Sequence, residues 1–303
     1  MAGAMAVARV GVWVVVVAAW CAACARGLYL PGLVPVDYEE GAALDVLASK
    51  LTSNRNKVPY GYYSLPLCVP SDAKRTRSGA VKSRRVNLGQ LLLGEHEYPT
   101  AYDMHLLLDQ QCVRMCDSNV TAVALNKVRR RILERYNVRL LLDTLPLLTR
   151  DSANVMYRDV PRYVQGYRLG SVRPAADEAA LNDSDPTSAA PVSARSGRMI
   201  LNNHVIFTVL YNAPVIAATD EFALNTARMY RIVGFHAEVM SIDYADALAA
   251  ETESGADAVH ALCVAAENTG SSPKALELHR DGPSKITFTY SVKFEKSDIT
   301  WAT

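Results

Sequence analysis

An alternating segment near the C-terminus constrains the fold of this chain most strongly. Residues 285–303 read KITFTYSVKFEKSDITWAT. Five large apolar residues in this segment alternate with polar ones: Ile286, Phe288, Tyr290, Val292 and Phe294. A β-strand gathers such residues on one face, whereas a helix would scatter them around its circumference. The segment is therefore predicted to be a half-buried strand that closes the domain at its edge, with its polar face in solvent.

The first 25 residues have the pattern of a secretory signal peptide. Arg9 is their only charged residue, and residues 10–25 form an uncharged run. Ala23 and Ala25 supply the small residues that signal peptidase needs, with cleavage before Arg26. An uncleaved signal anchor is the alternative, but the run of 16 residues is shorter than the roughly 18–20 that span a bilayer. We expect a signal peptide at residues 1–25 and a luminal domain at residues 26–303.

Four cysteines remain after the predicted cleavage: Cys68, Cys112, Cys116 and Cys263. In the oxidising secretory lumen they predict two disulfides, with three possible pairings that the sequence does not rank. The spacing of Cys112 and Cys116 is not the C-x-x-C of redox enzymes, and no second cysteine pair suggests zinc ligands. We therefore expect structural disulfides and no metal site. A bridge from Cys263 to the N-terminal half would join both halves into one unit.

Other motifs indicate a secreted chain without catalytic chemistry. Asn119 and Asn182 begin N-glycosylation sequons. The net charge of +1 gives no electrostatic reason to expect nucleic-acid binding. The six histidines are scattered and match no metal or hydrolase motif: His96, His105, His204, His236, His260 and His279. Asp103 and His105 are interpreted as a surface pair, and His204 as the polar start of a strand. No enzyme, catalytic residue or cofactor is predicted.

The apolar pattern predicts mostly strands. Residues 119–136 are predicted to form the one amphipathic helix, with Asn119 or Thr121 as its cap. Strands are expected at residues 199–211, buried on both faces, at 229–244, and at 138–148, broken at Pro146. Residues 44–52 fit a weak helix better than a strand. The predicted class is α+β, mainly β, a β-sandwich-like domain with one amphipathic helix and long loops.

Three segments are predicted to be loops, and each has a different composition. Residues 74–85 carry six basic residues and are read as a solvated loop. Residues 171–198 are rich in Ala, Ser, Pro and Asp and are expected to be flexible. Residues 245–274 are read as an acidic loop of small residues with at most one helical turn around Cys263.

Several blocks of the chain, taken in order, resemble the nonaspanins, or transmembrane nine superfamily. The resemblance begins with GLYLPGLVPVDY, KLTS and PYGYYSLPLCVP, within residues 27–70, and continues through LGQLLLGE, Cys112 and Cys116, and DTLPLLTR. It ends with QGYRLG, LNNHVIF, YRIVGFHAEVMSI and TYSVKFEKSDITWA, the last at residues 289–302. Several blocks in one order are more specific than any single motif, and they cover nearly all of the predicted mature chain.

The resemblance implies a signal peptide, a large luminal domain and then nine membrane-spanning helices in Golgi and endosomal membranes. Family members are associated with sorting membrane proteins toward the surface, with adhesion and with phagocytosis, and no catalytic residues carry over. The transmembrane region and the cytoplasmic tail are absent from this chain, and residues 74–85 and 171–198 depart from the family pattern. Selection of membrane proteins as cargo through membrane helices is therefore expected only of a longer parent.

The leading prediction is a non-enzymatic luminal domain of a nonaspanin-type endomembrane protein that serves the trafficking and localisation of membrane proteins. The alternative is a free-standing secreted binding or adhesion module from a truncated gene, with its C-terminal edge strand available to a partner. A secreted hydrolase is a third hypothesis, which would need a pocket with two convergent titratable groups.

Overall fold

The computed structural model describes residues 36–84, 96–150, 162–173, 198–213, 229–254, 257–270, 274–279 and 285–299. These residues belong to one compact unit, Val36–Thr303. The predicted signal peptide, Asn182 and nearly all of the predicted flexible loop at residues 171–198 lie outside the described residues.

The larger sheet has seven strands and is built around the C-terminal strand. Its order is β5-β15-β13-β14-β8-β9, and β1 pairs with β14. Most pairs are antiparallel, but β13 runs parallel to β15 and β14 runs parallel to β8. The strands are β1 (Tyr38–Glu39), β5 (Gln110–Asn119), β8 (Leu148–Arg150), β9 (Tyr163–Gln165), β13 (His204–Asn212), β14 (Met229–Met240) and β15 (Lys285–Lys296).

The second sheet has six strands in the order β10-β6-β2-β3, with β4 paired to β2 and β7 paired to β6. Its strands are β2 (Ala43–Ser53), β3 (Tyr60–Gly61), β4 (Tyr98–His105), β6 (Tyr136–Leu142), β7 (Leu145–Pro146) and β10 (Tyr167–Arg168). A two-stranded sheet joins β11 (Gly170–Arg173) to β12 (Arg198–Leu201). The helical segments are η1 (Tyr62–Ser64), α3 (Ala122–Leu133), α5 (Ala245–Ser254) and α6 (Ala258–Thr269).

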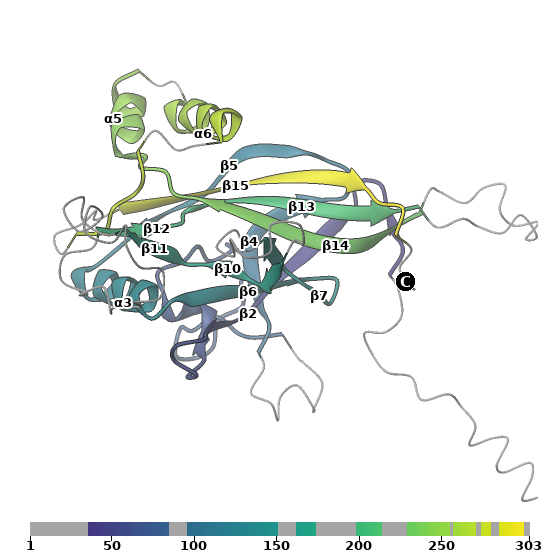
Figure 1. Ribbon diagram of the computed structural model, residues 1–303, viewed down its shortest axis with the longest axis horizontal. Coiled ribbons are helices and arrows are strands. Elements are labelled where there is room, and N and C mark those ends of the chain that lie inside the picture. Colours follow the sequence, from purple (N-terminus) through teal and green to yellow (C-terminus); the bar gives the residue numbers. More distant parts are fainter. Residues whose placement is uncertain are drawn as a thin grey trace, which may run out of the picture. The chain divides into compact units, whose positions relative to one another are not determined.

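The two large sheets pack face to face and bury the main core between them (Figure 1). Tyr102 of β4 crosses this interface, with its ring centroid 4.9 Å from that of Phe207 and 5.3 Å from that of Tyr290, both on the larger sheet. Such edge-to-face contacts between aromatic rings stabilise the packing of one layer on the other. The predicted mainly-β, sandwich-like class is confirmed.

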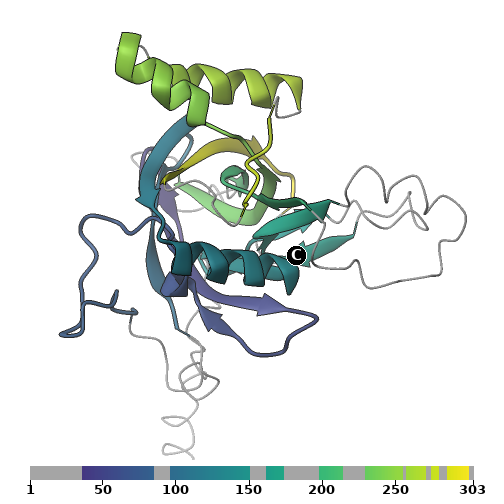
Figure 2. The ribbon, with the colours of Figure 1, turned by 90° about the vertical axis from the view of Figure 1, so that its left-hand side faces the viewer.

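The C-terminal strand β15 differs from its prediction in two ways. Its apolar face packs into the core as expected, but Thr287, Thr289 and Ser291 on the other face are also buried. Helices α5 and α6 lie on the side of the larger sheet that faces away from the smaller one, and they cover this polar face (Figure 2). In addition, β15 lies between β5 and β13, so the prediction of an edge strand is wrong.

The predicted loop at residues 245–274 is wrong, because most of its described residues belong to helices α5 and α6. Alanine has the highest helix propensity, and residues 245–266 are rich in it. Asp257 caps α6, because its carboxylate accepts a hydrogen bond from the backbone N–H of His260 at 3.0 Å. Gly270, with a φ of 64°, ends the helix in the left-handed conformation. These two capping residues are the local signals that predict α6.

The predicted helix at residues 119–136 is confirmed as α3 but is shorter. Thr121 caps it by accepting from the N–H of Ala124, and Leu125, Val128 and Ile132 are buried. The helix ends at Leu133 because Arg135 takes a positive φ of 55°, and Tyr136 already belongs to β6.

Bulges and turns account for the remaining corrections. The predicted weak helix is strand β2, in which Leu44, Val46 and Ala48 are buried in alternation until the register shifts before Leu51. Because of this shift, Leu44 and Leu51 are both buried although they are seven residues apart, a spacing that also fits one face of a helix. The predicted strand at residues 138–148 is broken at Asp143 and Thr144 rather than at Pro146. Both residues have a positive φ and form the turn between β6 and β7.

The other strand and loop predictions hold in part. On β13, Val205, Phe207 and Val209 are buried on one face, whereas Ile206, Thr208 and Leu210 on the other face are only half-buried. Strand β14 ends at Met240 rather than at Tyr244. Residues 74–84 of the basic segment are mostly exposed, as predicted.

Gly166 is expected to tolerate no side chain. It has a φ of 76°, and a Cβ there would lie 2.2 Å from the backbone oxygen of Val138. We expect Gly166→Ala to lower the free energy of unfolding by about 3 kcal/mol, because backbone strain and steric overlap add. Gly41→Ala is the matched control: its φ of 77° is the same, but no atom lies within 4 Å of the added Cβ. It should cost about 1 kcal/mol. Equal losses in urea unfolding would contradict this.

Candidate functional site

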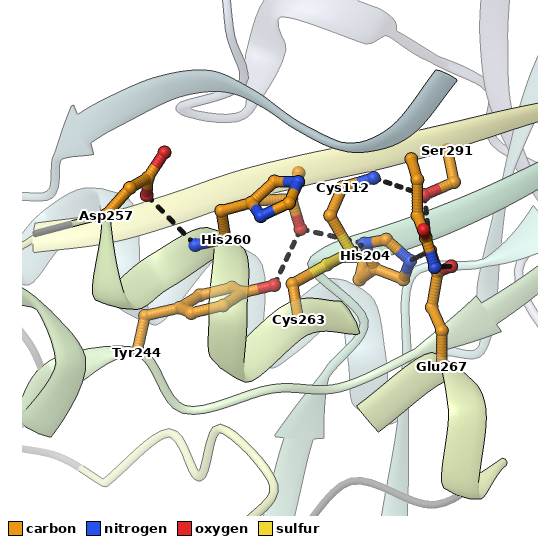
Figure 3. The surroundings of a disulfide bond; sticks show 10 residues. Cys112, His204, Tyr244, Asp257, His260, Cys263, Glu267 and Ser291 are labelled. Carbon is orange, nitrogen blue, oxygen red and sulfur yellow. Dashed lines mark hydrogen bonds and ion pairs between the residues drawn. A yellow bond between two sulfur atoms is a disulfide. The ribbon is translucent and has the colours of Figure 1, made fainter. Parts of the chain in front are cut away.

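A group of buried polar side chains lies where α6 covers the outer face of the larger sheet (Figure 3). Strand β13 contributes His204, β15 contributes Ser291, and α6 contributes Cys263 and Glu267. Positions 263 and 267 are four residues apart, so both side chains point from one face of the helix toward the sheet. Cys112 of β5 completes the group, which we call the α6 cluster.

A bulge in β5 directs Cys112 toward α6. The register of the β5–β15 pair shifts between Tyr290 and Val292, and Cys112 has a φ of 54°. Its backbone N–H donates to the hydroxyl of Ser291 at 2.7 Å. A bulge turns a side chain away from its regular direction, and here it brings the sulfur of Cys112 to that of Cys263.

His204 is fully buried and bonded at both ring nitrogens. Its Nε2 lies 2.9 Å from Oε1 of Glu267, and its Nδ1 lies 2.8 Å from the hydroxyl of Thr289. That hydroxyl also lies 2.7 Å from the hydroxyl of Tyr244. His204 is the first residue of β13, as predicted, but its imidazole is also the centre of an internal network that the sequence did not indicate. A buried imidazole needs such partners, because a ring nitrogen that loses its hydrogen bonds to water and gains none in the protein costs free energy.

Glu267 is the buried carboxylate of the cluster, with a side chain that is only 3% exposed. Burial acts to raise its pKa, but hydrogen bonds from His204, Ser291 and Gln111 outweigh burial and hold the pKa at about 2. The Ser291 hydroxyl donates to the same oxygen that faces His204, and Gln111 Nε2 donates to the other oxygen at 3.1 Å. The carboxylate thus remains ionised inside the protein.

The structure contains both predicted disulfides, Cys68–Cys116 and Cys112–Cys263. The second belongs to the α6 cluster and links residues 151 positions apart, so it joins the two halves of the chain. Cys263 Sγ lies 3.6 Å from Nδ1 of His204. One donor atom from each of Cys112, His204, Cys263 and Glu267 lies within 4.8 Å of the others.

The geometry of the α6 cluster does not match a hydrolytic triad. In such a triad the base bonds the nucleophile and a carboxylate orients the base. Here Ser291 and His204 both bond the carboxylate of Glu267. His204 is 0% exposed, so no substrate reaches it. In this form the cluster clamps α6 to the sheet.

A polar cavity of about 950 Å³ lies beyond the C-terminal end of α6. Two pairs of titratable groups face one another in its wall, with Lys274 Nζ 3.0 Å from Asp243 and His279 3.5 Å from Glu277. The hydroxyl of Ser241 in its wall accepts from the backbone N–H of Leu276. Among the described lining residues, no nucleophile is bonded to a base, so the cavity does not support the hydrolase hypothesis.

The other candidate residues are dispersed. Asp103 and His105 form the expected surface pair, 3.7 Å apart. Asn119 is exposed at the end of β5, and the hydroxyl of Thr121 in its sequon caps α3, so Asn119 itself is not the cap. Sequence analysis missed the grouping of His204, Glu267 and Ser291, because these residues are far apart along the chain.

Comparison with known proteins identifies the family. A family model described as Endomembrane protein 70 matches residues 59–303. The chain belongs to the Endomembrane protein 70 family. Its relatives include Transmembrane 9 superfamily member 4 of Homo sapiens, 29% identical over 286 residues, which are 90% of this chain and 37% of that protein. Transmembrane 9 superfamily member 10 of Arabidopsis thaliana is 27% identical over 91% of this chain and 37% of its own length.

This Endomembrane protein 70 chain thus spans less than two fifths of the length of these relatives. Member 11 of Arabidopsis thaliana is more similar over a shorter region, 33% identical over 141 residues. No solved structure matches the chain. Within the described ranges, none of the helices has the length and apolar character that crossing a bilayer requires.

Proposed function

We propose that this chain is the luminal domain of a nonaspanin-type endomembrane protein that supports the localisation of other membrane proteins between Golgi and endosomes. Its role is non-enzymatic. The observation that carries the proposal is the buried disulfide between Cys112 and Cys263, which joins the two halves of the chain. The chain that contains it belongs to the Endomembrane protein 70 family. Disulfides of this kind form in the secretory pathway and rarely in the cytosol.

The closed α6 cluster is consistent with a structural role. Its polar groups bond one another, and these hydrogen bonds hold α6 against β13 and β15. A fully satisfied buried network makes a domain rigid. A rigid domain held beside the membrane can present a constant surface to membrane proteins as cargo.

Two processing events belong to the same proposal. A signal peptidase removes residues 1–25 before Arg26. Asn119 accepts a glycan, since it is exposed and the cap of α3 does not need its side chain. Loss of one glycan in Asn119→Gln, seen as a shift after endoglycosidase treatment, tests exposure to the lumen.

The trafficking role is tested in cells from which this gene has been deleted. Surface biotinylation followed by quantitative proteomics should show a several-fold loss of a subset of membrane proteins, restored when the gene is returned. The tagged product should overlap with Golgi and endosomal markers. An unchanged surface proteome would overturn the proposal, and release of the protein into the medium would favour a free-standing secreted module.

A further inference from the structure

The α6 cluster contains four potential metal ligands, and two of them, the sulfurs of Cys112 and Cys263, are bonded to each other in the disulfide. Cys112, Cys263, His204 and Glu267 each offer one donor atom, and the four atoms lie within 4.8 Å of one another. Two thiolates, an imidazole and a carboxylate are the donor types that Zn²⁺ takes in proteins. The residues come from β5, β13 and α6, so a metal there would join the same elements as the disulfide does.

The distance between the sulfur and the imidazole matches a shared metal. Zinc bonds to thiolate at about 2.3 Å and to imidazole at about 2.05 Å, which places the two atoms about 3.5 Å apart at a tetrahedral angle. Cys263 Sγ lies 3.6 Å from Nδ1 of His204. The two sulfurs, which are bonded here, would have to separate to about 3.8 Å. His204 is therefore already in position, and the cysteines need to open.

The surroundings orient His204 for this role. Glu267 bonds Nε2, which leaves Nδ1 directed toward the sulfur and the Thr289 hydroxyl. Metal-binding histidines are commonly fixed through their second nitrogen in this manner. Glu267 is in turn held by Ser291 and Gln111. To become the fourth ligand, its carboxylate has to leave Nε2 of His204 and turn toward the sulfurs, from which one of its oxygens lies within 4.8 Å.

We propose that reduction of the Cys112–Cys263 disulfide converts the α6 cluster into a binding site for one Zn²⁺ ion, with Cys112, Cys263, His204 and Glu267 as ligands. The disulfide and the metal are alternative cross-links between β5 and α6. This inference does not depend on the trafficking role.

The conversion balances as two steps. A dithiol reductant gives two electrons and two protons to the disulfide, the S–S bond breaks, two thiols form, and the reductant leaves as its own disulfide. Zn²⁺ then displaces the two thiol protons and binds both thiolates. Because both sulfurs are buried, with exposed fractions of 2% and 0%, the first step requires α6 to move away from the sheet.

The test uses the whole chain, produced by secretion and then reduced with a phosphine, which does not compete as a thiol ligand. Co²⁺ serves as the probe and Zn²⁺ as the competitor. We expect one equivalent of Co²⁺ with the visible bands of tetrahedral cobalt and a thiolate charge-transfer band, and Zn²⁺ should remove both. The oxidised chain should bind no Co²⁺ at this site.

Variants separate this site from other donors. Cys68→Ala/Cys116→Ala should retain the bands, and Cys112→Ala/Cys263→Ala should lose them. His204→Ala should weaken Co²⁺ binding at least tenfold. His260→Ala is the matched control on the exposed face of α6 and should bind like the unmodified chain. Glu267→Gln keeps the shape of the side chain and should also weaken Co²⁺ binding. It replaces His204→Ala in the test if that variant does not fold.

Three results would overturn the proposal. One is a reduced chain without the tetrahedral cobalt bands. Another is a set of bands that survives in Cys112→Ala/Cys263→Ala. The third is a reduced chain that loses its far-ultraviolet circular dichroism and does not regain it when Zn²⁺ is added, since the metal must restore the cross-link.

Discussion

Replacement of Cys112 and Cys263 together by alanine is expected to lower the free energy of unfolding by about 5 kcal/mol. The disulfide links residues 151 positions apart, and its loss frees a long loop in the unfolded chain. By the same chain-entropy relation, the pair Cys68 and Cys116, 48 positions apart, should contribute about 4 kcal/mol. Urea unfolding followed by circular dichroism measures both values.

The larger effect of the Cys112–Cys263 pair also has a kinetic consequence. Without it, α6 is held to the sheet by the hydrogen bonds around Glu267 and by apolar packing. We therefore expect faster amide hydrogen exchange in α6 and little change in β2 or β6. Val123→Ala, at a position that is 68% exposed, is the control and should leave stability nearly unchanged. A loss below about 2 kcal/mol for the double variant would contradict the prediction.

Replacement of Glu267 by alanine should lower the free energy of unfolding by about 3 to 5 kcal/mol, because it leaves His204 and Ser291 buried without their partner. Glu267→Gln is the matched variant, since its amide oxygen still accepts hydrogen bonds. It should cost about 1 to 2 kcal/mol. Equal losses for the two variants would show that the network does not depend on these bonds.

The ionised state of Glu267 also predicts a pH dependence. Its folded pKa of about 2 lies below the ordinary value of 4.5, so its contribution to stability is complete above 4.5 and falls as the pH drops toward 2. The stability difference between the unmodified chain and Glu267→Gln should therefore shrink with acid over this range. A difference that is constant with pH would contradict the assignment.

The success of the predictions depended on whether local spacing carried the information. Strand β15 was predicted because its alternating residues encode one apolar face directly. Helix α6 was missed, although Asp257 and Gly270 mark its two ends. The alanine-rich segment between them has few large apolar residues, and it buries small ones such as Ala266 against the sheet. A prediction that relies on large residues overlooks such a helix.

The grouping of residues in the α6 cluster could not be predicted from their spacing in the sequence. The four potential ligands span residues 112 to 267, and among them only Cys263 and Glu267, four residues apart on α6, are close in sequence. The bulge at Cys112 and the register of β13 against β15 bring these residues together. Neither feature has a signature in a single sequence, because a bulge is selected by the packing of the whole sheet.

The amino-acid sequence by itself determined the mainly-β class, the use of four cysteines in two disulfides, and membership of the family, because alternation, residue type and ordered motifs are properties of the chain. Tertiary structure alone decided which cysteines pair and why the polar face of β15 is buried. The physical reason is that Ser291 and His204 can leave water only when α6 supplies Glu267 as their partner, while His204 in turn bonds the buried hydroxyl of Thr289. That partner is close in space and distant in sequence.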